Sequence, residues 1–176
     1  MPNTQSPTDV SPATIAAVID AIDYSGLSVQ PDYIDPNGHM NVGYYTLLFD
    51  KALDLPWARL GIYSAMLLAQ SGKSSFALEA HFTYQRELLL GDPLHFTFRL
   101  LDFDAKRVHY FMQMLHAKER YVAATFEQLS ICVDIKTRRS ASWSDNVFEL
   151  LQALHAEHST RRVPPEAGHA VGIRRR

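Results

Sequence analysis

The spacing of apolar residues along the chain changes from a helical period to a strand period. In residues 41–53 the apolar side chains follow the i, i+3, i+4, i+7 spacing of a helix that buries one face: Tyr45, Leu48, Phe49 and Ala52. Pro56 is expected to end or kink this helix near Asp54, because proline lacks the N–H that a helix interior needs.

Shorter patterns flank this helix. Residues 12–22 have helical spacing, and residues 27–34 are predicted to form a first strand that ends in a turn at 35–38. Residues 57–70 are predicted to form a short helix and a connector closed by Ser71 and Gly72.

Beyond Gly72 the apolar residues alternate with polar ones, which predicts strands at 76–85, 94–101, 108–115 and 121–135. Short polar turns separate these strands, so they favour an antiparallel meander with one face on a core. A last helix is predicted to begin at Ser144, which is a suitable N-cap.

The predicted order is strand, loop, helix, four strands and helix. An amphipathic helix wrapped by an antiparallel sheet is the economical packing for this order, so the fold class is α+β. We expect an N-terminal tail with a short helix over 1–22, one domain over 23–158, and a disordered C-terminal tail over 159–176.

Composition narrows the classes of partner. The chain has 176 residues and a formal net charge of −2, which argues against nucleic acid as a partner. Its apolar runs are too short to cross a bilayer, and its first ten residues show no secretory signal. The single cysteine, Cys132, falls in a strand pattern and is interpreted as a buried small hydrophobe. These features predict a cytoplasmic protein that has no membrane partner.

The segment Asp35-Pro36-Asn37-Gly38-His39-Met40-Asn41 carries the candidate chemistry. It places an acid, a turn and a histidine directly before the helix, whose start offers unpaired N–H groups and a positive dipole end. A carboxylate opposite such donors can attack a carbonyl or activate water while the donors hold the oxygen that gains charge. The alternative is that Asp35 and Asn41 merely cap the turn and the helix.

The same segment matches the D-x-x-G-H-x-N pattern of the hotdog-fold acyl-CoA thioesterases, in the branch similar to 4-hydroxybenzoyl-CoA thioesterase. Weaker matches are Tyr84 to Asp92 and the run from Ala124 to Gln128. The resemblance covers roughly residues 27–146. It implies a hotdog fold, in which the sheet wraps the central helix, and acyl-CoA hydrolysis in a homodimer or homotetramer with active sites between subunits.

The resemblance also implies residue roles. The catalytic carboxylate corresponds to Asp35, and the backbone N–H groups that bind the oxyanion correspond to Val42 and Gly43. The chain departs from the 4-hydroxybenzoyl-CoA type at positions 39–41, where that enzyme is more apolar. A related branch uses an acid inside the helix, for which Asp50 is the candidate, but the loop acid is favoured here.

Neighbouring residues extend this candidate site. His39 can orient Asp35, donate to the thioester oxygen or protonate the leaving group, or it can be a structural loop histidine. Asn41 can hold water or the carbonyl, although it is also a good N-cap. Tyr44 is placed at the acyl pocket or a dimer seam. Glu79 and Gln128 are substrate-binding candidates whose alternative is a solvated or interface face.

Other catalytic classes find little support. The eight histidines show no close Cys/His ligand spacing, so no metal site is predicted, and no Gly-x-Ser-x-Gly elbow is present. A thioester is already activated, so no cofactor is expected beyond the coenzyme A of the substrate. Its phosphates need cations at the pocket mouth, and four residues are candidates: Lys73, Arg86, Lys106 and Arg107.

The sequence therefore predicts an enzyme that hydrolyses a small or medium acyl-CoA thioester. Two alternatives remain, a hotdog enoyl-CoA hydratase or dehydratase and a non-catalytic acyl-CoA-binding protein. Two-sided apolar alternation, with Phe111 and Leu115 opposite Tyr110 and Met112, predicts a dimer or larger assembly, because one helix cannot cover both sheet faces.

Overall fold

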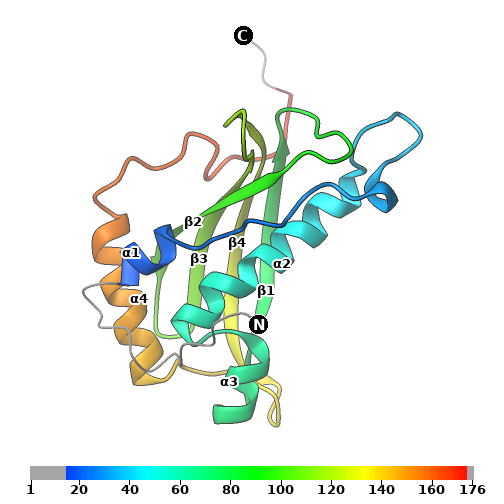
Figure 1. The fold of residues 1–176 in the computed structure, drawn as a ribbon. Helices are drawn as coiled ribbons and strands as arrows, with labels where there is room; N and C mark the ends of the chain where they lie inside the picture. Colours follow the sequence, from blue (N-terminus) through cyan, green and yellow to red (C-terminus); the bar gives the residue numbers. More distant parts are fainter. Residues whose placement is uncertain (1–14, 174–176) are drawn as a thin grey trace.

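A five-stranded antiparallel sheet forms the centre of the protein (Figure 1). Its long strands lie in the order β1–β4–β3–β2, and their bounds are β1 (Lys73–Tyr84), β2 (Leu94–Phe103), β3 (Arg107–His116) and β4 (Val122–Asp134). The short strand β5 (Arg139–Ser140) pairs with the end of β4. The four strands predicted from the period-two pattern are confirmed, with ends that differ by at most three residues.

The computed structural model describes residues 15–173. The N-terminal tail and the first three residues of the helix predicted over 12–22 lie outside this range. Helix α1 (Ile15–Asp20) accounts for most of the remainder of that prediction.

Helix α2 (Val42–Leu60) lies along one face of the sheet (Figure 1). It buries the stripe that the sequence predicts, and Phe49 lies at the centre of it, completely buried. The Phe49 ring packs against Phe126, Phe96 and Phe82 at centroid distances of 5.3, 5.7 and 6.1 Å. The α+β arrangement of a helix wrapped by an antiparallel sheet is thus confirmed.

Of the two effects predicted for Pro56, an end or a kink, the end of the helix near Asp54 is wrong, because α2 continues through Pro56 to Leu60. Proline removes one backbone hydrogen bond, but Pro56, Trp57 and Leu60 are all buried against the core. Burying side chains of this size stabilises the last turn by about 2 kcal/mol each, which offsets the lost bond. The helix ends instead at Gly61, whose φ of 70° is the left-handed C-cap conformation.

The prediction of a regular strand over 27–34 is also wrong. An isolated bridge pairs Ser28 with Pro93, just before β2, and the chain then enters the short 3-10 helix η3 (Pro31–Tyr33). A second isolated bridge pairs Ile34 with Met40. Pro31 has no N–H for a sheet ladder and its fixed φ suits the start of a helical turn, so it interrupts the pairing.

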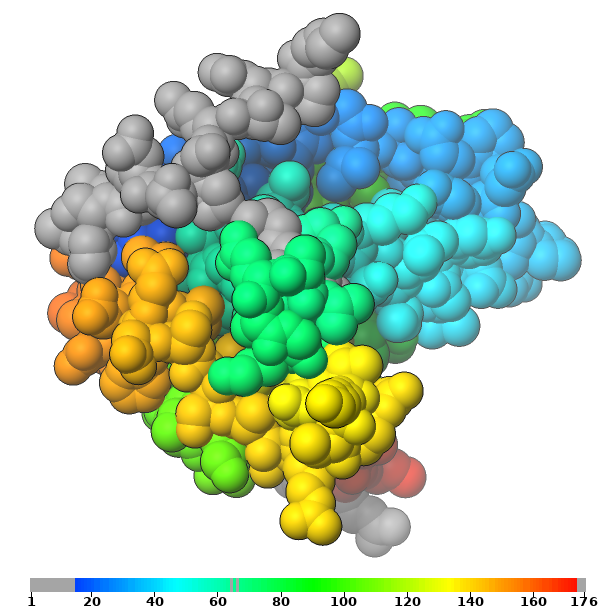
Figure 2. Space-filling view, turned by 90° about the horizontal axis from the view of Figure 1, so that it is seen from below, coloured from blue at the N-terminus to red at the C-terminus, as the bar shows by residue number. Residues whose placement is uncertain are grey.

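The segment predicted as a short helix and a connector over 57–70 is divided by Gly61. Its first residues complete α2, and α3 (Ser64–Ser71) follows and ends at Gly72. Figure 2 shows this lower end of the molecule, where α3, coloured green, lies at the surface. Helix α4 (Asp145–His158) packs beside α1 and β2 and begins after Ser144, as the sequence predicts.

The sequence argument for a second subunit relied on apolar residues on both faces of the sheet, and it does not hold for the face opposite α2. Phe111 and Leu115 lie on this face, yet they are only 1% and 8% exposed in the single chain. They therefore require no second subunit to cover them.

Residues 159–173 cross from α4 back to the sheet without forming a helix or strand, where the sequence predicts a disordered tail (Figure 1). The Gly168 N–H donates to Glu127 Oε2 at 2.8 Å, and the Gln85 Nε2 donates to Glu166 Oε1 at 3.1 Å. These contacts place the segment against the sheet.

His158, the last residue of α4, should make the free energy of unfolding depend on pH. Its ring is fully buried, and Nδ1 accepts the Leu100 N–H at 2.9 Å. Burial lowers the pKa of His158 to about 4, below its ordinary value near 6.5. The unfolded chain therefore binds an additional proton between these values, and the free energy of unfolding falls as the pH drops through this window.

The expected loss from this group between pH 7.5 and pH 5 is about 2 kcal/mol. Urea unfolding at both pH values measures it. His158→Gln keeps an acceptor for Leu100 and should remove this part of the acid dependence. An identical acid loss in the variant would show that His158 is not responsible.

Candidate active site

The loop before α2 folds as a closed turn around Asp35. The Gly38 N–H donates to the Asp35 carbonyl at 2.9 Å, and the Asp35 N–H donates to the His39 carbonyl at 3.0 Å. Gly38 has a φ of 86°, which favours glycine at this position. The Asp35 Oδ1 accepts the Asn37 N–H at 2.8 Å, so the Asx-turn role considered from the sequence is present.

This turn fixes the position of the Asp35 carboxylate and leaves it partly exposed. The Asp35 Oδ2 lies 3.3 Å from Asn37 Nδ2 and 3.8 Å from His39 Nδ1. The Asp35 side chain is 13% exposed, and that of His39 is 37% exposed. The His39 Nδ1 also lies 3.3 Å from the Met40 carbonyl. The imidazole is thus near enough to attract the carboxylate when protonated, but the two groups do not share a hydrogen bond.

Asn41 caps helix α2, because its Oδ1 accepts the Gly43 N–H at 3.0 Å. One of the two backbone donors expected to hold an oxyanion is therefore already used. Within residues 15–173, the Val42 N–H makes no hydrogen bond. Val42 is the free donor at the helix start, and Gly43 becomes available only if the Asn41 side chain moves.

A cavity of about 430 Å³ opens beside this loop. It is lined by residues of the loop and the helix start, and by residues at the end of β1 and in the turn that follows. These are Asp35, His39, Met40, Asn41, Val42, Tyr45, Tyr84, Gln85, Arg86 and Glu87. The structure thus brings together Asp35, His39, Asn41 and Val42 of the sequence-predicted residues.

The sequence did not identify the Tyr45 and Tyr84 side chains as parts of the cavity. Their rings meet edge to face at 5.3 Å, and Tyr45 is buried while Tyr84 is half exposed. Burial raises the pKa of both phenols, so both are neutral near pH 7. Tyr45 belongs to the core stripe and Tyr84 ends a strand, so only the fold brings them together.

Three predicted substrate-binding residues lie elsewhere in the single chain. Tyr44 stacks on Tyr33 at 4.5 Å and does not line the cavity. Glu79 and Gln128 line a separate cavity of about 390 Å³ that shares no residue with the first. That second cavity contains a close pair, His109 Nε2 and Glu127 Oε1, at 2.7 Å.

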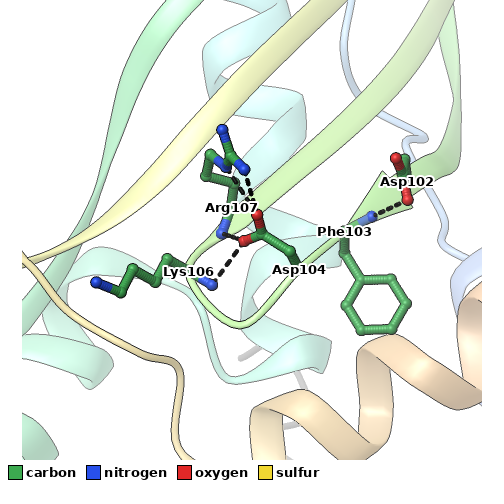
Figure 3. A network of polar contacts seen from close by, with 5 residues as sticks. All are labelled: Asp102, Phe103, Asp104, Lys106 and Arg107. Atoms are coloured by element: carbon green, nitrogen blue, oxygen red, sulfur yellow. Dashed lines mark hydrogen bonds and ion pairs between the residues drawn. The ribbon is translucent and has the colours of Figure 1, made fainter.

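The four basic candidates are also separated. Lys73 donates from its ammonium to the Ser142 carbonyl at 2.8 Å. Arg107 is paired with Asp104 at 2.6 Å, and Lys106 lies in the same turn with its side chain extended away from that carboxylate (Figure 3). Arg86 alone of the four lines the cavity that contains Asp35.

Other candidate chemistry does not gather around this cavity. Asp50 is exposed and does not line it. Cys132 is buried, and burial raises the pKa of its thiol. Among residues 15–173 no cluster of three or more His, Cys, Asp or Glu side chains is suited to hold a metal ion, and no helix has the length and apolar character to span a membrane.

Comparison with known proteins shows the family of the chain. Residues 29–153 match the family described as the thioesterase-like superfamily. The chain is 31% identical to a betainyl-CoA thioesterase of Pseudomonas aeruginosa, covering 82% of this chain and 91% of that protein. It is 32% identical to an L-carnitine dehydrogenase/betainyl-CoA thioesterase of Rhizobium meliloti over 84% of this chain. It spans only 29% of the length of the latter protein.

A solved structure of a Staphylococcus aureus protein in complex with CoA is similar, with a TM-score of 0.77 and 26% identity. The alignment covers 84% of this chain and 92% of that one. The resemblance to hotdog thioesterases inferred from the loop motif is confirmed. The chain belongs to the thioesterase-like superfamily, and it is a thioester hydrolase by class.

Proposed function

We propose that this protein hydrolyses a small or medium acyl-CoA thioester to a carboxylic acid and free coenzyme A. The observation that carries the proposal is the Asp35 carboxylate, held by Asn37 at the edge of a cavity that also contains the free Val42 N–H. Asp35, a nucleophile or base, and Val42, which has a free backbone donor, both line this space of about 430 Å³, which is the size of small-ligand pockets.

In this mechanism the thioester carbonyl oxygen lies against the Val42 N–H at the positive end of α2. Asp35 either takes a proton from water, which attacks the carbonyl carbon, or attacks that carbon itself and forms an acyl anhydride that water then hydrolyses to the carboxylic acid and free Asp35. The C–O bond forms, the C–S bond breaks, and the electron pair leaves on sulfur. His39 is near enough to the carboxylate to help deliver a proton to the departing thiolate.

The substrate class we favour carries a quaternary ammonium group. Two relatives are named for activity on betainyl-CoA, whose acyl group ends in trimethylammonium. Aromatic faces attract such cations, and the neutral Tyr45 and Tyr84 rings line the cavity beside the Asp35 and Glu87 carboxylates. This combination supports betainyl-CoA as the substrate to test first.

A matched pair of thioesters tests this substrate class. Betainyl-CoA and 3,3-dimethylbutanoyl-CoA have acyl groups of nearly the same shape, but only the first is charged. We expect kcat/KM for betainyl-CoA to be about tenfold higher, within the range of a desolvated cation–π contact. Thiol release measures both substrates, and a panel of other chain lengths and aromatic acyl groups tests alternatives.

Two variants sharpen that test. Tyr84→Leu should reduce the preference for the charged acyl group, whereas Tyr84→Phe keeps the ring and should retain it. Equal kcat/KM for the two thioesters in the wild-type protein would rule out recognition of the cation.

We also propose that the active protein is a homodimer formed through β1. This strand is at one edge of the sheet, and the middle of it is exposed. Phe76 and Leu78 are 40% and 54% exposed there. An unpaired edge with apolar side chains invites pairing with a second chain, and Tyr84 at its end would place each active site near the interface.

A further inference from the structure

The Arg86 guanidinium is held against an aromatic ring at the mouth of the candidate active site. Its central carbon lies 3.8 Å from the centroid of the Tyr121 ring, within the range of a cation–π contact. The backbone is fixed as well, because the N–H groups of Gln85 and Arg86 both donate to the Ala123 carbonyl. Arg86 is therefore oriented at two points while its side chain remains 58% exposed.

The Tyr121 ring is held in place by contacts with His116 and Glu87. It stacks on the His116 ring with centroids 5.2 Å apart and an angle of 25° between the planes. The Tyr121 hydroxyl donates to the Glu87 carbonyl at 3.2 Å. His116 is buried, its Nδ1 accepts the Glu119 N–H at 3.0 Å, and its Nε2 lies 3.5 Å from Asp92.

The ion pair that Arg86 forms is weak, so its guanidinium is available to bind an anion. Its acidic neighbour is Glu119, at 3.7 Å, and that side chain is 61% exposed. An ion pair between two such exposed groups contributes little, so a doubly charged phosphate can displace Glu119. Arg107 differs, because Asp104 binds it through two guanidinium nitrogens (Figure 3).

We propose that Tyr121 is a positioning residue that holds Arg86 as the phosphate-binding group for the coenzyme A part of the substrate. The proposal rests on the proposed function, since a phosphate is expected here only if the substrate is a coenzyme A thioester. Arg86 forms charge-assisted hydrogen bonds with a phosphate at the mouth of the cavity while the acyl group reaches Asp35. In the single chain Lys73, Lys106 and Arg107 do not line this cavity.

Calorimetric titration of the purified protein tests the subsite without turnover. The ligands are CoA, 3′-dephospho-CoA and pantetheine, which has no phosphate. We expect Arg86→Ala to weaken CoA binding about tenfold and pantetheine binding less than twofold. The dephospho ligand shows whether the 3′-phosphate or the pyrophosphate is bound, and either result fits the proposal.

Variants of the supporting ring separate positioning from general structure. Tyr121→Leu should weaken CoA binding about threefold, whereas Tyr121→Phe keeps the ring and should stay within twofold of wild type. Glu119→Gln should strengthen binding about twofold, because a competing carboxylate is lost. Arg107→Ala is the matched arginine control and should bind CoA as wild type does.

The proposal is overturned if wild type does not bind CoA more tightly than pantetheine, or if Arg86→Ala binds CoA normally. Equal losses in Tyr121→Phe and Tyr121→Leu would also overturn it, because the ring would then not be what positions Arg86. Failure of the proposed function looks different: CoA would bind through Arg86 as expected, yet no thioester would release thiol.

Discussion

Replacing Asp35 with asparagine should lower kcat for thioester hydrolysis at least about a hundredfold. The amide is neither a base nor a nucleophile, so the attack step loses its driving group. Its oxygen can still accept the Asn37 N–H, now bonded at 2.8 Å, so the turn before α2 should persist. Thiol release measures the rate, and circular dichroism and thermal unfolding check that the fold is retained.

Two controls separate chemistry from structure in that experiment. Asn37→Ala removes the side-chain amide that lies 3.3 Å from Asp35 Oδ2 but keeps the backbone N–H donor, so it should reduce activity less than Asp35→Asn. Asp50→Asn changes an exposed acid on α2 that does not line the cavity and should leave activity near wild type. Full activity in Asp35→Asn together with a large loss in Asp50→Asn would move the chemistry to the helix.

A charge on the exposed edge strand should separate the proposed dimer into monomers. Leu78 is 54% exposed near the middle of β1, and Leu78→Lys would bring two ammonium groups close together if β1 pairs with its copy. Inward or edge-facing lysines are a common means of preventing edge pairing. Light scattering at micromolar concentration should give a dimer mass for wild type and a monomer mass for the variant.

Val163→Lys is the matched control, since Val163 is also exposed but follows Arg161, which contacts β2 at the other edge. This variant should remain dimeric. A wild-type monomer, or a dimer that survives Leu78→Lys, would show that β1 is not the interface.

The long strands and helix α2 were predictable because each buries one face, which gives its apolar residues a regular spacing. The four strands and the α2 stripe follow from side chains that alternate with period two or recur every three to four residues. Prediction was wrong where a single proline was weighed without its surroundings. Pro56 stays within a helix because its neighbours are buried, whereas Pro31 starts the 3-10 helix η3 in place of the predicted strand.

The candidate site was predictable only where its residues are contiguous. Asp35, His39, Asn41 and Val42 lie in one loop and helix start, so their sequence order keeps them together. Tyr84 and Arg86 reach the same cavity only because β1 ends beside α2. The sequence also identifies Asn41 as an N-cap, and the structure shows that its side chain accepts the Gly43 N–H.

The product balance of the wild-type protein tests the central claim most directly. Purified protein is incubated with the acyl-CoA panel, and free thiol, carboxylic acid and remaining thioester are measured in the same samples. Hydrolysis predicts one free coenzyme A and one carboxylic acid for each thioester consumed. Thioesters that gain or lose water with no thiol release would indicate a hydratase or dehydratase, and CoA thioesters that bind unchanged would indicate a binding protein; either result would contradict the account.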